Sequence, residues 1–134
     1  MRDEKRIIVV EDDLDINDLI AYNLRKEGFS VEQVFDGQEA RQKLRNEDFT
    51  IAIIDIMLPG EDGTELCREI KGSGHPARTF VIMVSAKSSP QDKLYAHILG
   101  ADCYFTKPFN VGELMSMVHE IYELQNKEFV VTPK

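Results

Sequence analysis

Five short apolar segments recur along the chain, and segments with helical periodicity lie between them. Most residues of the apolar segments are β-branched or aromatic, as in buried strands. The segments cover residues 7–10, 31–34, 51–54, 80–84 and 103–105. Strands that alternate with helices form a parallel sheet with helices on both faces. Because crossovers between parallel strands are right-handed, we expect an α/β fold: a five-stranded parallel sheet in a doubly wound, three-layer (βα)5 sandwich.

Capping residues mark where several predicted helices begin and end. Ser89 followed by Pro90 is typical of a helix N-terminus with proline at the first helical position. Asn110 and Glu113 are spaced as a second N-terminal cap pair. Glycine is the usual residue just after a helix, and it stands where helices should end at Gly28, Gly72 and Gly100. The pattern therefore predicts one domain over residues 1–125, with residues 126–134 as a C-terminal tail or the start of a linker.

Length, charge and hydropathy limit the classes of protein. The 134 residues fit one domain, and no apolar run approaches the ~18 residues that cross a bilayer. The charged N-terminus leads into only four apolar residues, too few for a signal-peptide core. A net charge of −8 argues against direct nucleic acid binding, which needs a basic face. We expect a soluble, cytoplasmic domain that binds a divalent cation or a basic partner rather than a membrane.

Polar residues follow the predicted strands at one edge of the sheet. In a doubly wound sheet the working site lies beyond the carboxyl ends of the strands. The residues at those ends are Glu11 and Asp12 after the first strand, Asp55 after the third, Ser85 after the fourth and Lys107 after the fifth. We therefore expect these side chains to meet at one place.

The carboxylates Glu11, Asp12 and Asp55 would be crowded at this edge. Like charges at close range raise a carboxyl pKa and cost stability unless a cation lies among them. Oxygen ligands of this kind suit Mg²⁺. The alternative is that they are acids of helix N-termini, favoured by the helix dipole. That explains Asp13 well, but not Asp55, which follows an apolar strand and precedes another apolar segment.

Lys107 and Ser85 add the groups that an anion would need. A lysine ammonium near Asp55 would supply the positive charge that holds a phosphoryl oxygen. The hydroxyl of Ser85 can hydrogen-bond the same oxygens. Tyr104, in the fifth predicted strand, is either an ordinary core aromatic or a ring near the surface that changes rotamer when Ser85 moves.

Four motifs taken together resemble the signature of response-regulator receiver domains. They are residues 9–13 (Val-Val-Glu-Asp-Asp), the segment around Asp55, residues 84–86 (Val-Ser-Ala) and residues 100–109, which end in Thr-Lys-Pro-Phe. Their order and spacing match, and the resemblance runs from about Lys5 to Leu124. It implies a flavodoxin-like topology, with residues 1–125 as a receiver domain of a two-component system.

The resemblance also implies roles for individual residues. Asp55 matches the phosphoacceptor, Ser85 and Lys107 match the groups that hold the phosphoryl oxygens, and Tyr104 matches a switch aromatic. The implied Mg²⁺ ligands are Asp12 and Asp55 directly, Glu11 largely through water, and the backbone carbonyl of Met57. The Lys107–Pro108 peptide bond is expected to be cis.

The implied activity is transfer of a phosphoryl group from a partner histidine kinase or phosphotransfer protein to Asp55. The domain would catalyse its own phosphorylation and dephosphorylation and would not be an enzyme with an external substrate. Its output would be a changed surface, formed by the fourth helix, fifth strand and fifth helix, that a downstream effector reads. In winged-helix members this face pairs two receivers through matched charges. Residues 113–125 contain no arginine or lysine, so we expect a different partner surface.

Three other interpretations fit the sequence less well. A haloacid-dehalogenase-type phosphatase needs a second carboxylate two residues after the nucleophile, where this chain has Met57. A flavin binder needs a Ser/Thr/Gly-rich phosphate loop after the first strand, where the acidic residues 11–13 would repel a phosphate. A receiver fold that works as an interaction module without phosphorylation remains the alternative.

Overall fold

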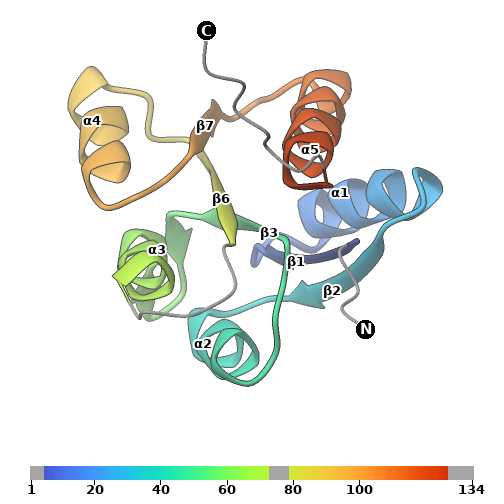
Figure 1. Ribbon diagram of the computed structural model, residues 1–134. Helices are drawn as coiled ribbons and strands as arrows, with labels where there is room; N and C mark the ends of the chain where they lie inside the picture. Colours follow the sequence, from blue (N-terminus) through green and yellow to red (C-terminus); the bar gives the residue numbers. More distant parts are fainter. Residues whose placement is uncertain (1–4, 73–78, 127–134) are drawn as a thin grey trace, which may run out of the picture.

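A central parallel sheet runs through the computed structural model, which describes residues 5–72 and 79–126 (Figure 1). Its strand order is β2-β1-β3-β6-β7, and all neighbouring strands are parallel. The strands are β1 (Arg6–Val10), β2 (Ser30–Val34), β3 (Ile51–Asp55), β6 (Phe80–Ser85) and β7 (Cys103–Thr106). The predicted five-stranded parallel sheet is confirmed. The predicted tail or linker lies outside the described residues, except for Asn126.

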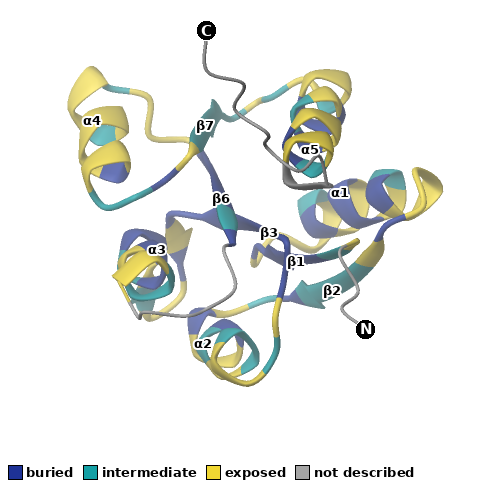
Figure 2. Ribbon diagram, in the orientation of Figure 1, coloured by how far each residue is buried: buried dark blue, intermediate teal, exposed yellow. Residues whose placement is uncertain are grey.

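Helices cover both faces of the sheet. They are α1 (Leu14–Lys26) and α5 (Val111–Asn126) on one face, and α2 (Gly37–Asn46), α3 (Gly63–Gly72) and α4 (Pro90–Ile98) on the other (Figure 1). Successive strand residues point to opposite faces, so Ile7 and Val9 pack towards α1 and α5, and Ile8 and Val10 towards α2 and α3. The central strands β1, β3 and β6 are buried, the edge strands β2 and β7 are mostly of intermediate exposure, and the outer helix faces are exposed (Figure 2). Among the helices of the described ranges, none has both the length and the apolar character that a membrane span requires.

The helix boundaries follow from capping residues that the sequence displays. Ser89 and Asp92 form a reciprocal capping box, with Pro90 in the first turn of α4. The Oδ1 atom of Asn110 accepts a hydrogen bond from the backbone N–H of Glu113, 3.0 Å away, at the start of α5. Gly28 and Gly100 follow α1 and α4 with positive φ, which favours glycine there. These predicted helix ends are confirmed.

A short hairpin between β3 and α3 was not predicted from the sequence. Its strands, β4 (Met57–Leu58) and β5 (Glu61–Asp62), are antiparallel. The turn between them contains Gly60 at φ +67°. Strands of two residues are too short to show an alternating pattern. The hairpin matters for the site because it begins two residues after Asp55.

Gly63 brings the start of α3 against the end of β3. Its backbone N–H donates to the carbonyl oxygen of Ile56 at 2.7 Å. A Cβ atom at position 63 would lie 2.2 Å from the backbone oxygen of Asp55. Only a residue without a side chain allows this close approach. Gly63 therefore fixes the backbone path immediately after Asp55.

We predict that Gly63→Ala destabilises the protein by about 1–3 kcal/mol, because the new methyl group overpacks the backbone at Asp55. Gly72→Ala is the matched control, since a Cβ atom at that helical glycine meets nothing within 4 Å. It should be neutral or stabilising, because alanine favours the helix. Urea unfolding of both variants measures the difference, and equal stability of the two would contradict this account of Gly63.

Candidate functional site

Three carboxylates gather beyond the carboxyl ends of β1 and β3. Oxygen atoms of Glu11, Asp12 and Asp55 all lie within 4.8 Å of one another. Glu11 and Asp55 are almost fully buried, with 2% and 5% of their surface exposed, whereas Asp12 is exposed. The parallel strands bring these residues together, as the sequence predicts. The arrangement is an acidic pocket, open to solvent on the side of Asp12.

Lys107 is the cation that faces the two buried carboxylates. Its Nζ atom lies 2.7 Å from Oε1 of Glu11 and 2.9 Å from Oδ2 of Asp55. The Lys107 backbone N–H donates to the carbonyl oxygen of Ser85 at 2.8 Å. The following peptide bond, Lys107–Pro108, is cis, as expected. Lys107 is thus held by both its backbone and its side chain.

The burial of these charges changes their proton affinity. Burial is the main cause that raises the pKa of Glu11 from 4.5 to about 7, and the charge of Asp55 adds to it. The hydrogen bonds that Glu11 receives from Lys107 and from the backbone N–H of Asp13 act in the opposite direction. Burial lowers the pKa of Lys107, but its hydrogen bonds to Glu11 and Asp55 outweigh that effect and raise the pKa above its ordinary value. Lys107 therefore stays charged.

Both oxygens of the Asp55 carboxylate have a donor. Oδ1 accepts a hydrogen bond from the backbone N–H of Met57 at 3.0 Å, and Oδ2 accepts one from Lys107 at 2.9 Å. The two donors fix the plane of the carboxylate. The side chain of Met57 itself is 55% exposed beside the pocket. The orientation of the Asp55 carboxylate is therefore defined, as is that of Glu11, whose oxygens contact Lys107 and the backbone N–H of Asp13.

Ser85 and Tyr104 meet at the backbone of Lys87, in the loop between β6 and α4. The fully buried Ser85 accepts a hydrogen bond at Oγ from the Lys87 N–H, 3.1 Å away. The Tyr104 hydroxyl donates to the Lys87 carbonyl oxygen at 2.7 Å. Burial raises the pKa of Tyr104 while the Ser85 hydroxyl lowers it. The Tyr104 ring is partly buried and packs against the core on the α4 side of the sheet.

The comparisons with known proteins identify the family. The family model of the response regulator receiver domain matches residues 7–119. The chain belongs to this family. A CheY-like response regulator receiver domain protein from Methanospirillum hungatei JF-1 is 34% identical with a TM-score of 0.84, covering 92% of this chain and 97% of the other. The receiver domain of the Francisella response regulator 1452 is 29% identical with a TM-score of 0.85, covering 92% and 100%. The BeF3-activated DrrB receiver domain is 32% identical with a TM-score of 0.82, covering 90% and 99%.

Asn17 of α1 supports the backbone next to the acidic pocket of this receiver domain. The sequence did not predict this role for Asn17. Its side chain is fully buried in α1 and donates from Nδ2 to the carbonyl oxygens of Glu11 at 2.9 Å and Val34 at 3.0 Å. Its Oδ1 atom accepts from Nε2 of Gln33 at 2.9 Å. Asn17 therefore joins the ends of β1 and β2. The available signal was its place one turn before the buried Ile20 and Ala21 of the same helix.

The acidic pocket has the donor set that a hard divalent cation takes. Its ligand atoms are carboxylate oxygens, and the exposed side chain of Asp12 leaves room for retained water, which suits Mg²⁺. Of the three carboxylates, Glu11 and Asp55 pair with the Lys107 ammonium. Burial and the charge of Asp55 raise the pKa of Glu11, and a cation among the carboxylates would favour the charged form. These residues fit the Mg²⁺ site that the sequence predicts.

We predict that metal-free stability depends on Glu11 and falls as the pH rises. Between pH 4.5 and about pH 7 the folded state keeps a proton on Glu11 that the unfolded chain loses, so stability decreases through this window. Glu11→Gln removes this titration. Urea unfolding in EDTA, from about pH 5 to pH 8, should show the variant gaining stability relative to the wild type as the pH rises. A difference that does not change with pH would contradict the raised pKa.

Proposed function

We propose that the receiver domain accepts a phosphoryl group on Asp55 from a phosphohistidine of a partner histidine kinase or phosphotransfer protein. The observation that carries the proposal is the orientation of Asp55. Its two oxygens are fixed by the Met57 N–H and by Lys107, inside a pocket with two more carboxylates. Membership of the response regulator receiver family supports the same reaction class.

In the proposed reaction Asp55 is the nucleophile. One carboxylate oxygen bonds to phosphorus, the bond between phosphorus and the imidazole nitrogen breaks, and its electron pair leaves with the imidazole. The product is an acyl phosphate. Such a transfer needs mainly alignment and charge stabilisation, and a fixed carboxylate supplies the alignment.

Lys107 supplies positive charge where the phosphoryl oxygens arrive. Its ammonium lies within 3 Å of both Glu11 and Asp55, so it needs only a small displacement to contact a group bonded to Asp55. A Mg²⁺ ion, held by Asp12, Asp55, the carbonyl of Met57 and, through water, Glu11, would supply the remaining charge for these oxygens. The same environment favours attack by water, so the domain would also dephosphorylate itself without turning over an external substrate.

The proposed output passes through Ser85 and Tyr104. A phosphoryl oxygen that accepts the hydrogen bond of the Ser85 hydroxyl draws Ser85 towards Asp55 and away from the Lys87 N–H. The loop at Lys87 then moves, Tyr104 loses its acceptor and turns inward, and the surface of α4, β7 and α5 changes. This is a population shift between two arrangements of the loop. On α4, the exposed side chains of Leu94, Tyr95 and Ile98 support this surface as the contact for a downstream effector.

We predict that acetyl phosphate with Mg²⁺ adds one phosphoryl group to the protein and that Asp55→Asn abolishes the adduct. EDTA should also abolish it, because the carboxylates alone would repel the donor. Intact-mass spectrometry measures the adduct directly. Asp48→Asn, an aspartate before β3 and outside the pocket, is the matched control and should be phosphorylated like the wild type.

Absence of an adduct under every condition would overturn the proposed phosphorylation. The domain would then be a receiver fold that works as an interaction module without phosphorylation. An adduct that persists in Asp55→Asn would instead place the acceptor at another residue.

We predict that Ser85→Ala keeps phosphorylation but weakens the switch. The variant loses the hydroxyl that links the phosphoryl group to the Lys87 loop, while Asp55 and Lys107 are unchanged. Amide NMR spectra before and after phosphorylation should show smaller shifts in α4, β7 and α5 than the wild type. Equal shifts in both proteins would show that Ser85 is not part of the switch.

A further inference from the structure

Arg41 of α2 makes the densest set of charged contacts in the described part of the chain, away from the acidic pocket. Its Nη1 and Nη2 atoms lie 2.6 and 2.7 Å from the two carboxylate oxygens of Glu61, in a bidentate pair. Its Nε atom donates to Glu69 of α3 at 2.9 Å. The hydrogen bonds of Glu61 and Glu69 raise the pKa of Arg41 above its ordinary value. We propose that Arg41 is a positioning residue of the phosphoacceptor site, an inference that rests on the proposed function.

The contact between Arg41 and Glu61 differs from an ordinary surface ion pair. The side chains are 21% and 18% exposed, less than most other charged pairs of the described residues. Bidentate pairing of a planar guanidinium also restricts orientation as well as distance. A Cβ atom at Gly37, the first residue of α2, would lie 2.5 Å from Cγ of Glu61. The stem of Glu61 therefore lies directly on α2, where Gly37 leaves space for it.

Glu61 belongs to the hairpin that contacts Asp55. It pairs with Leu58 across β4 and β5, and Met57 pairs with Asp62. The backbone N–H of Met57 then donates to Oδ1 of Asp55. Holding Glu61 on α2 consequently holds the hairpin, and the hairpin orients the Asp55 carboxylate and the proposed Mg²⁺ ligand at the Met57 carbonyl. Arg41 acts through these contacts and touches neither Asp55 nor the pocket.

Glu69 provides a control because it also pairs with Arg41 but lies outside the hairpin. It is on α3, where it also pairs with Arg45 at 3.4 Å. Glu69→Gln and Glu61→Gln each remove one negative charge next to Arg41. Only Glu61→Gln releases the hairpin from α2. If Arg41 only stabilises the fold, both variants should lose Mg²⁺ affinity alike. If Arg41 positions the hairpin, only Glu61→Gln should lose Mg²⁺ affinity.

The test is a Mg²⁺ titration followed by amide NMR, on the wild type, Arg41→Gln, Glu61→Gln, their double variant and Glu69→Gln. We expect Arg41→Gln and Glu61→Gln to weaken Mg²⁺ binding roughly 3- to 10-fold, below the ~10–100-fold typical of residues that contact a metal ligand directly. The double variant should bind about as weakly as either single variant, because both remove the same contact. Glu69→Gln should stay within about twofold of the wild type.

A second readout separates positioning from stability. In metal-free samples the Met57 amide resonance should shift in Arg41→Gln and Glu61→Gln but not in Glu69→Gln, since this amide donates to Asp55. If Arg41→Gln does not fold, Glu61→Gln tests the same contact from its other side.

Unchanged Mg²⁺ affinity in Glu61→Gln, or an equal loss in Glu69→Gln, would overturn the inference and leave the proposed function intact. A wild type that binds no Mg²⁺ would overturn the inference, and if it also formed no phosphoryl adduct, the proposed function would be overturned as well. Phosphorylation by acetyl phosphate, measured separately on the wild type, distinguishes these two failures.

Discussion

The ion pairs of Lys107 with Glu11 and Asp55 are the interaction on which the site depends. A parallel sheet brings the carboxyl ends of its central strands together, and here that places two almost fully buried carboxylates side by side. Uncompensated charges in such a position cost several kcal/mol each. Lys107 follows the edge strand β7, and its Nζ atom lies 2.7 Å from the Glu11 carboxylate and 2.9 Å from that of Asp55. Burial, with a contribution from the charge of Asp55, raises the pKa of Glu11 despite its hydrogen bond to Lys107, which leaves the pocket suited to a further cation.

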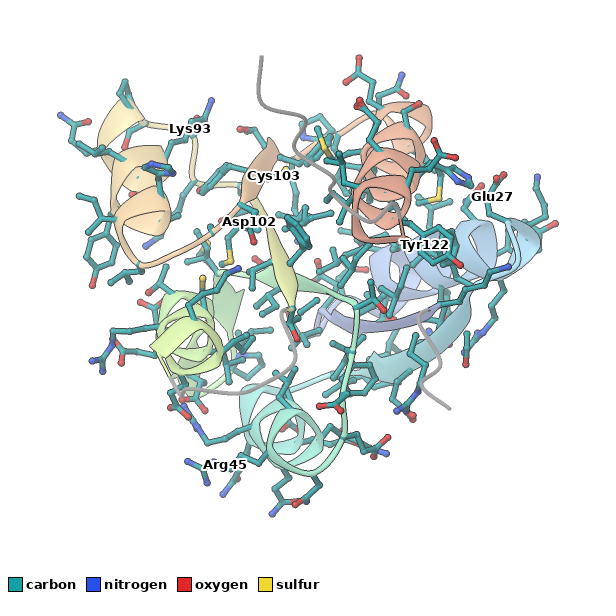
Figure 3. The ribbon with its side chains drawn as sticks, viewed as in Figure 1. Glu27, Arg45, Lys93, Asp102, Cys103 and Tyr122 are labelled. Carbon is teal, nitrogen blue, oxygen red and sulfur yellow. The ribbon has the colours of Figure 1, made fainter. Side chains whose placement is uncertain are left out.

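The chain holds this charged cluster in place through the backbone of its loops. Asn17 ties the carbonyl of Glu11 to the end of β2, and Gly63 presses the start of α3 against Asp55. The Met57 N–H and the Lys87 N–H each donate to a site side chain two residues earlier. Away from the pocket, Arg45 of α2, labelled in Figure 3, pairs with Glu69 of α3, and Glu27 pairs with His119 of α5. The backbone contacts next to Asp55 and Ser85 therefore set much of the geometry of the site.

Most of the fold and much of the site could be predicted from the sequence, for physical reasons that also explain the gaps. Apolar strands and capped helices are local patterns, so the sheet and the helix ends of α4 and α5 were predictable. Parallel topology then placed Glu11, Asp55 and Lys107 together without further information. The hairpin after Asp55, the buried Asn17 and the pairing of Arg41 with Glu61 were not predictable. The hairpin strands are too short to show an alternating pattern. The contacts of Asn17 and Arg41 join separate segments of the chain, and a charged or amide side chain in a helix usually faces solvent.

In the proposed switch, the hydrogen bonds at Lys87 would connect a local event at Asp55 to a distant surface. Ser85 holds the Lys87 N–H and Tyr104 holds its carbonyl, so one peptide segment is restrained by a residue at the pocket and a residue at the surface. Displacement of Ser85 removes the first restraint and weakens the geometry of the second. Because α4 begins at Pro90, just beyond this loop, its exposed apolar residues would move with the loop in the proposed switch. Residues 113–125 contain no arginine or lysine, so for the proposed output α5 offers apolar and acidic groups, which favours an effector with apolar or basic character over a second copy held by matched charges.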